Sequence, residues 1–348
     1  MVETLDTAGG ATTASVLQRE HDWLVKSYRY LRSAMVGLVL CLAVAVLWQS
    51  VQGRSILSSV SAYYYTPAQG IFVGVLVAIG VCMIVLKGTT EAEDILLNVA
   101  GMLAPVVAVV PTGRGLDYDR AIEACRVTDR LSVAGTEMTA TDCPSVLALR
   151  QATAANVENN MVALFAVGLA GLIATVFFAK SDGTTTRRFW IGFSIAVTAY
   201  ALALLAFVGF TGEFIDKAHY AAAFGMFGCV VAVAAINALR HTGVRLTEAR
   251  GPWNKVRRVA GTLFFSGDRY AVVALAMVVV IAVGGVLALT NTFDNTVFYL
   301  EGTLTLLFAV FWTIQTQERW HFGNRFVVTP TLLGHEDETG PRRSARPG

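Results

Sequence analysis

Long apolar stretches recur along the whole chain, with short polar segments between them. The stretches run to about 17 to 22 residues, which is the length that an α-helix needs to cross the hydrocarbon core of a bilayer. The pattern therefore predicts an all-α fold, a polytopic bundle of about eight transmembrane helices. The predicted spans are residues 34–51, 68–86, 95–110, 161–179, 189–210, 218–239, 271–290 and 297–315.

The third predicted span is the shortest and contains Pro105. A proline is tolerated in a membrane helix when neighbouring groups satisfy the freed carbonyl. The acids Glu91, Glu93 and Asp94 precede this span, where carboxylates favour the positive end of the helix dipole. Asn98 and Asp94 are four residues apart and share a helix face, which leaves open a polar cytoplasmic mouth.

A polar, aromatic segment at residues 58–74 leads into the second span. It carries Tyr63, Tyr64 and Tyr65, and tyrosine is enriched where a membrane meets water. Pro67 follows them, in the place where a proline costs a helix no hydrogen bond. Two interpretations remain open: a boundary belt with a turn, or the mouth of a ligand or substrate site.

Charge adds an orientation to this topology. Hydrophobic residues make up 55% of the chain and charged residues only 15%. Of the 27 lysines and arginines, 20 fall on the side of the membrane that holds both termini when there are eight spans. The positive-inside rule then predicts that both termini are cytoplasmic. Arginine greatly outnumbers lysine, which is typical of a high-GC bacterial genome and predicts a multi-pass protein of a bacterial inner membrane.

The chain divides into three predicted parts. Residues 1–32 form a cytoplasmic tail and an amphipathic segment, which either lies on the membrane surface or extends the first span. Residues 33–316 form the bundle, with an extracytoplasmic loop at 112–158 and a basic cytoplasmic loop at 240–270. Residues 317–348 form a cytoplasmic tail. We expect no cleaved signal sequence, because no small-residue cleavage site follows the first apolar run.

The two long loops predict different features. In the loop at 240–270, apolar residues such as Trp253 alternate with lysine and arginine, a pattern typical of a helix that lies in the interface and attracts anionic lipid. Membrane lipids are thus the expected partners, and nothing predicts nucleic acid. The outer loop holds Cys125 and Cys143, for which an oxidising compartment predicts a disulfide.

Polar groups within the spans are the main candidates for function, because they are costly in a bilayer. Glu301 lies about one turn into the last span, and His219 begins the sixth span on the same side. Both reach the level of the tyrosine segment. We therefore predict one outer-leaflet ligand site, without metal or cofactor. Its members are Ser61, Tyr63, Tyr64, Tyr65, Glu213, Asp216, His219 and Glu301.

A simpler interpretation of the same residues also stands. Asp216 is placed to cap its helix, His219 to donate to a carbonyl, and Glu301 to reach water near the boundary. The oligomeric state is open, and so is whether the protein is an enzyme. The leading hypothesis is binding of a lipid-like or small amphipathic ligand. The alternatives are an intramembrane lipid hydrolase and a proton-coupled transporter whose polar path ends at Asp94 and Asn98.

A short set of motifs carries a family resemblance. The motifs resemble an uncharacterised family of bacterial multi-pass membrane proteins, and they are the Ser-Val-Ser-Ala-Tyr-Tyr-Tyr-Thr segment at 59–66, Phe72-Val73-Gly74, Asp94, Asn98 and the Pro-Thr pair at 111–112. The resemblance covers about the first third of the chain and implies a fold without an activity. The seven-span hydrolases that include alkaline ceramidases need a His-x-x-x-His pair, which this sequence lacks.

Overall fold

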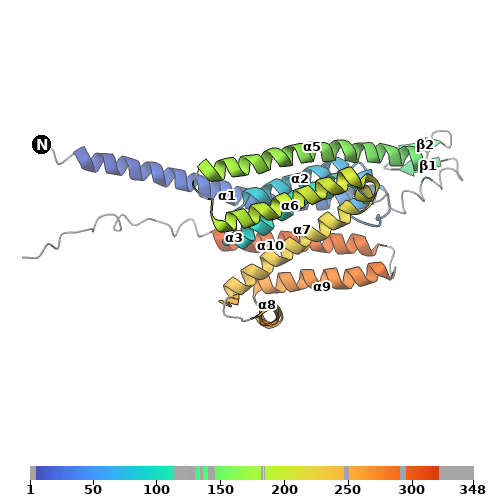
Figure 1. Cartoon of the computed structure of the whole chain (residues 1–348). Helices are drawn as coiled ribbons and strands as arrows, with labels where there is room; N and C mark the ends of the chain where they lie inside the picture. The colour runs from blue at the N-terminus through green and yellow to red at the C-terminus, as the bar shows by residue number, and fades with distance from the viewer. Residues whose placement is uncertain are drawn as a thin grey trace, which may run out of the picture. The chain divides into compact units, whose positions relative to one another are not determined.

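The structure is a computed structural model of the chain (Figure 1). It describes residues 5–112, 122, 130–133, 136–139, 146–181, 183, 185–246, 251–290 and 295–320. The helices are α1 (Leu5–Gln52), the 3-10 helix η1 (Ser61–Tyr65), α2 (Gln69–Val85), α3 (Glu91–Val109), α5 (Val146–Ser181), α6 (Arg187–Gly209), α7 (Thr211–His241), α8 (Pro252–Phe265), α9 (Arg269–Leu289) and α10 (Thr296–Trp320). Strands β1 (Arg130–Val133) and β2 (Thr136–Thr139) pair antiparallel, with Arg130 opposite Thr139.

The predicted all-α membrane bundle is confirmed. Within the described residues, seven helices are long and apolar enough to cross a membrane, namely α1, α3, α5, α6, α7, α9 and α10. The predicted second span corresponds to α2, a shorter apolar helix of 17 residues. At about 1.5 Å per residue, α2 is at the lower limit of spanning length.

Contacts at its two ends show how far α2 extends. The serine at the start of η1, just before α2, contacts His219 near the start of α7. Immediately after α2, Thr89 accepts a hydrogen bond from Arg240 near the end of α7. Since α7 is long enough to span, α2 covers most of the same thickness, which accounts for an eighth crossing. We call these levels of the bundle the Ser61 end and the Arg240 end.

The chain forms two compact units. One combines Met1–Arg29 with Gln315–Gly348, and the other is Tyr30–Ile314. In the first unit, the Arg29 guanidinium donates to the carbonyl of Trp320 and lies 5.2 Å from the centre of its ring. The N-terminal amphipathic segment is helical and forms part of α1, which is one helix from Leu5 to Gln52. The second unit holds the candidate site.

Helices α2 and α3 approach closely at two glycines. A Cβ added at Gly101 would lie 2.6 Å from the carbonyl oxygen of Gly80, and one at Gly80 would lie 2.8 Å from that of Gly101. Any side chain at either position would therefore push the backbones apart. Small residues at helix contacts serve this purpose in membranes. Pro105 lies beside the same contact, within the helix that was predicted to hold it.

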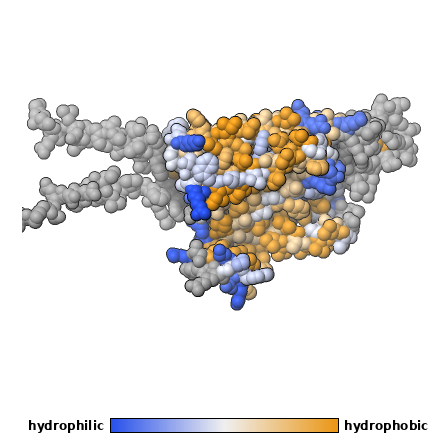
Figure 2. All heavy atoms as spheres, viewed as in Figure 1, coloured by the Kyte–Doolittle hydropathy of each residue, from blue (hydrophilic) through white to orange (hydrophobic). Residues whose placement is uncertain are grey.

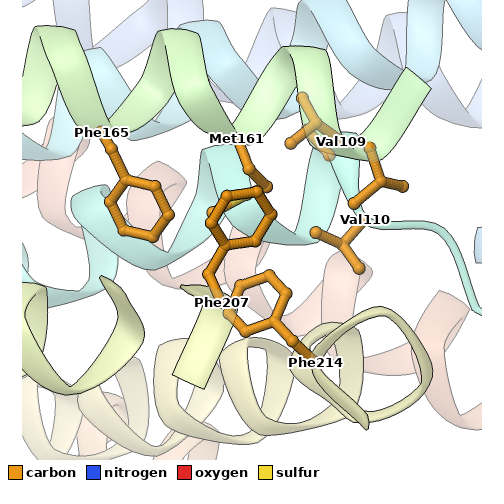
Figure 3. Close-up of a cluster of buried hydrophobic side chains, with 8 residues drawn as sticks. Val109, Val110, Met161, Phe165, Phe207 and Phe214 are labelled. Atoms are coloured by element: carbon orange, nitrogen blue, oxygen red, sulfur yellow. The ribbon is translucent and has the colours of Figure 1, made fainter. Parts of the chain in front are cut away.

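An apolar cluster joins four helices near the Ser61 end (Figure 3). It fixes the end of α3 against α5, α6 and α7, and the Tyr200 hydroxyl adds a 2.8 Å hydrogen bond to the carbonyl of Phe165. The end of α3 matters for the site, as shown below. The buried members are Ala108, Val109, Val110, Val157, Met161, Phe165, Phe207 and Phe214.

The outer surface of the bundle is apolar. Figure 2 shows hydrophobic side chains across most of the visible face, with hydrophilic ones gathered toward the two ends. Large apolar side chains such as Val167 and Val208 are 71% and 72% exposed. A protein in water would rarely expose such a continuous apolar surface. Together with the helix lengths, this surface identifies an integral, multi-pass membrane protein.

Candidate functional site

The 3-10 helix η1 carries the first candidate residue, and its own sequence explains its shape. The Ser59 hydroxyl accepts a 2.9 Å hydrogen bond from the N–H of Ala62, which caps the turn. At the other end, the Thr66 hydroxyl donates to the carbonyl of Tyr63 at 2.7 Å. The first N–H groups of a helix have no partner within it. That of Ser61 is consequently free to bond to another element.

Ser61 joins two residues from distant helices. Its Oγ lies 2.9 Å from Nε2 of His219 on α7. The same Oγ lies 3.1 and 3.2 Å from the two carboxyl oxygens of Glu301 on α10. Its backbone N–H donates to Glu301 Oε2 at 3.0 Å. The predicted proximity of Ser61, His219 and Glu301 is therefore observed, with the serine between the other two.

The end of α3 orients His219. Its Nδ1 lies 2.7 Å from the carbonyl oxygen of Val110, and the side chain is completely buried. Helix α3 stops at Val109, and Val110 has an extended conformation. Pro111 explains this, because the residue before a proline avoids the helical region. The carbonyl of Val110 thus points at the imidazole. The simpler interpretation of the sequence predicted that His219 donates to a carbonyl, but it did not identify Val110, although a proline directly after a span indicates unpaired carbonyls.

Glu301 is held from the start of α10. The N–H of Phe298 donates to the carbonyl of Ser58 at 3.0 Å, which ties the first turn of α10 to the segment before η1. The backbone of Val60 also hydrogen-bonds to the Glu301 carboxyl group. Glu301 itself is half-buried. The carboxyl group therefore faces the backbone donors at the start of η1.

The three predicted tyrosines serve to anchor η1. The Tyr63 hydroxyl bonds to the Ser50 hydroxyl of α1, and the ring is fully buried. The Tyr65 hydroxyl donates to the carbonyl of Thr112 at 2.9 Å. The Tyr64 ring packs edge-on against those of Tyr65 and Phe72, with centres 5.4 and 6.5 Å apart. These contacts agree better with a support for Ser61 than with an open ligand mouth.

Two predicted members do not join the cluster. Glu213 pairs with Lys217 on the same helix, and their side chains are 65% and 76% exposed. Asp216 is exposed as well. The reason is that α7 begins at Thr211, well before the predicted start of the span at 218. On a helix, residues three and six positions before His219 point progressively away from its direction. Glu213 and Asp216 consequently face outward.

An apolar groove lies beside the cluster. It has a volume of about 440 Å³ and opens sideways between α9 and α10. Its α10 wall includes Leu300, the neighbour of Glu301, while Val283 and Tyr299 are 54% and 58% exposed. The sequence prediction did not include this groove. Its lining residues are Val279, Val280, Val283, Gly284, Leu287, Thr296, Tyr299 and Leu300.

The Arg240 end has a separate set of polar contacts. Asp94 accepts a hydrogen bond from the N–H of Gly88 at 2.5 Å. Glu93, which is fully buried, accepts from the Thr89 N–H at 2.5 Å and lies 3.7 Å from the guanidinium of Arg240. These acids close the turn before α3. Asp94 therefore has a structural partner at the place where a polar mouth was predicted.

The remaining predictions concern cysteines and metals. Cys125 and Cys143 lie outside the described residues, so the structure does not support the predicted disulfide. Among the described cysteines, Cys41, Cys82 and Cys229 are free. Within the described part of the chain, no group of three or more His, Cys, Asp or Glu side chains is arranged to hold a metal.

Comparison with known proteins gave no match. No protein-family model, no curated protein and no solved structure matches this chain. The resemblance to a bacterial membrane protein family therefore stays a prediction, and any function must be argued from the site.

Proposed function

We propose that this integral membrane protein binds an amphipathic, lipid-like molecule at its Ser61 end. The observation that carries the proposal is the juxtaposition of an apolar groove with a polar cluster on one turn of α10. Leu300 lines the groove, and the next residue, Glu301, bonds to Ser61. A bacterial inner membrane is the proposed location, supported by the arginine-rich composition.

The dimensions of the groove suit a hydrocarbon chain. Its α9 wall extends from Val279 to Leu287, which corresponds to about 12 Å along a helix. Its volume of about 440 Å³ lies within the usual range for small-molecule sites. The groove opens sideways, toward the apolar surroundings of the bundle. An acyl chain can therefore enter from the bilayer without crossing water.

Polar groups lie beside one end of the groove. Tyr299 lines it and is exposed. Tyr220 follows His219 on α7, and the centres of the two rings are 5.7 Å apart. Tyrosine presents an apolar ring with a hydroxyl that donates and accepts hydrogen bonds. These two phenols would contact the polar end of the ligand, while Ser61 and His219 hold Glu301 in place behind them.

Lipid hydrolysis has less support. The 2.9 Å contact between Ser61 Oγ and His219 Nε2 is within the range for a nucleophile and its base. However, Ser61 and His219 are only 4% and 0% exposed, and Glu301 occupies a second position on the same hydroxyl. A carboxyl group beside the nucleophile would disfavour the negative charge that develops during acyl transfer.

Proton-coupled transport is also less supported. His219 and Asn237 are five helical turns apart on the same buried face of α7. The buried residues between them are apolar: Ala222, Met226, Val230, Val233 and Ala234. This face of α7 therefore offers a proton no polar step between the Ser61 end and the Arg240 end.

Photocrosslinking tests the proposed binding. The protein is reconstituted in nanodiscs with a phospholipid that carries a diazirine on its acyl chain, and the crosslinked residues are mapped by mass spectrometry. We expect crosslinks at the groove positions of α9 and α10. The substitution Val283→Trp fills the groove and should lower the crosslink yield there several-fold.

Val272→Trp is the matched control. Val272 is also on α9 and is 55% exposed, close to the 54% of Val283, but it does not line the groove. Ordinary bilayer lipid contacts both positions, so this variant corrects for nonspecific labelling. If Val272→Trp and Val283→Trp change the yield equally, or if neither changes it, the groove is no more than lipid-facing surface and the proposal is wrong.

A further inference from the structure

The hydrogen bonds of Ser61, His219 and Glu301 restrict how many protons the three side chains hold together. A carbonyl oxygen can only accept, so His219 Nδ1, 2.7 Å from the carbonyl of Val110, must carry a hydrogen and donate it. The remaining ring nitrogen, Nε2, faces Ser61 Oγ at 2.9 Å. Whether Nε2 carries a hydrogen then depends on whether the Ser61 hydroxyl donates to it or accepts from it.

Ser61 has one hydroxyl hydrogen and two neighbours that need one. If it donates to Nε2 of His219, its contact with Glu301 at 3.1 Å is a hydrogen bond only when the carboxyl group is protonated. If it donates to Glu301, its contact with Nε2 is a hydrogen bond only when His219 is protonated there. A neutral imidazole together with a carboxylate leaves one of the two contacts without a hydrogen.

We propose that Ser61, His219 and Glu301 form a proton-binding site that holds one shared proton and carries no net charge. In one state His219 and Glu301 are both neutral. In the other the imidazole is positive and the carboxylate negative. The two states differ by moving one hydrogen from Glu301 to Ser61 and one from Ser61 to His219, so that no proton enters or leaves.

The surroundings favour such a site. His219 and Glu301 lie on helices long enough to cross a membrane, α7 and α10, and a net charge within a membrane is costly. The backbone N–H of Ser61 bonds to Glu301 in either state. The exposed ion pair of Glu213 and Lys217 points away from the cluster. Other titratable groups at this end include Tyr63, Tyr64 and Tyr65 on η1, Asp216 and Tyr220 on α7, and Tyr299 on α10.

This inference does not depend on ligand binding. It concerns protons that the cluster holds in the unliganded protein. Loss of crosslinking in the groove would leave it intact, and its own failure would leave the groove proposal intact.

The test measures both protonation states at once by solid-state NMR of the full chain in lipid bilayers at neutral pH. The chain has five histidines. A version in which the other four are replaced by glutamine reports only His219, through ¹⁵N in its ring. Carboxyl ¹³C in glutamate reports Glu301, which is assigned by comparison with Glu301→Gln.

The expected result is a matched pair: a neutral imidazole with a carboxylic acid, or an imidazolium with a carboxylate. In Glu301→Gln we expect a neutral His219, because the amide NH₂ replaces the carboxyl hydrogen toward Ser61. In Ser61→Ala the two groups should titrate independently. A neutral His219 beside a Glu301 carboxylate in the unsubstituted cluster would overturn the proposal, and so would an imidazolium beside a carboxylic acid.

Discussion

At the scale of single residues, Ser61 connects the polar side chains of the candidate site. It contacts His219 and Glu301 through one oxygen, and it bonds to Glu301 again through its backbone N–H. The two partners come from different helices, α7 and α10, and both contact Ser61. Removing the hydroxyl would therefore leave polar atoms of both helices unpaired in an apolar environment.

The variant Ser61→Ala tests this role. We expect it to lower the free energy of unfolding by about 1 to 3 kcal/mol, the usual cost of leaving buried polar groups unsatisfied. Glu301→Gln should cost less, because its amide can donate to Ser61 Oγ and still accept from the Ser61 N–H. The measurement is unfolding of the detergent-solubilised protein by increasing denaturing detergent.

Thr305→Val is the control for this experiment. The Thr305 hydroxyl donates to the carbonyl of Glu301 at 2.8 Å, a contact within α10 alone. Its loss removes a hydroxyl from a half-buried position without breaking a contact between two helices. Equal destabilisation by Ser61→Ala and Thr305→Val would show that the contacts between helices add nothing to stability.

The sequence predicted the central residues of the site but not their roles. Glu301 and His219 were identified because polar groups are rare within apolar spans, and Ser61 because it precedes a span on the same side. A carbonyl partner for His219 was predicted, but Val110 was not identified as that partner, since the position of its carbonyl depends on where α3 ends. Glu213 and Asp216 were misplaced because both lie on α7, where their spacing from His219 turns their side chains away from it.

At the scale of elements, the length of an apolar run predicted the position of a helix well. It did not predict where that helix begins and ends in the polar sequence around it. Each predicted span lies within, or within a few residues of, an observed helix, since an apolar run of spanning length has few alternatives in a bilayer. The helices α1, α5 and α7 extend well beyond those spans into polar sequence. The groove between α9 and α10 could not be predicted from the sequence, because it depends on helix packing that apolar periodicity does not encode.

Helix α8 lies in the loop at 240–270, where the sequence predicts a contact with anionic lipid. In Figure 1 it is seen along its axis, while α9 extends across the view, so the two helices lie crosswise. Trp253 is 82% exposed and Phe264 63% exposed. Lys255 and Arg257 are exposed on the same helix. An amphipathic helix with this composition and direction suits the interface plane.

The prediction for α8 concerns lipid retention. Each basic residue near an anionic surface contributes about 1 kcal/mol. We expect the double variant Lys255→Gln/Arg257→Gln to retain less phosphatidylglycerol relative to phosphatidylcholine, as counted by native mass spectrometry after purification from mixed vesicles. Lys180→Gln/Arg187→Gln removes the same charge from the same end of the bundle but outside α8, and it should lower the ratio less. If both double variants retain phosphatidylglycerol and phosphatidylcholine in the same ratio, α8 is not the element that contacts anionic lipid.

At the scale of the whole molecule, the alternating helices place particular segments on opposite sides of the membrane. The segment before η1 lies at the Ser61 end, and the connection between α5 and α6 lies at the Arg240 end, as α8 does. Lys180, Arg187 and Arg240 are at that second end, together with the basic residues of α8. The positive-inside rule then predicts that the Arg240 end faces the cytoplasm.

Cysteine labelling in intact cells tests this orientation. In a chain without its native cysteines, Ser55→Cys introduces an exposed thiol near the Ser61 end, and Ser181→Cys introduces one at the end of α5. A membrane-impermeant maleimide should label the first in whole cells and the second only after lysis, because the charged reagent cannot cross the bilayer. The reverse result would mean that the bundle is inserted the other way round, with the polar cluster in the inner leaflet. Labelling of both thiols from outside would contradict the crossing of α2 itself, since the chain would then cross the membrane an even number of times between Ser55 and Ser181, where α2, α3 and α5 make three crossings.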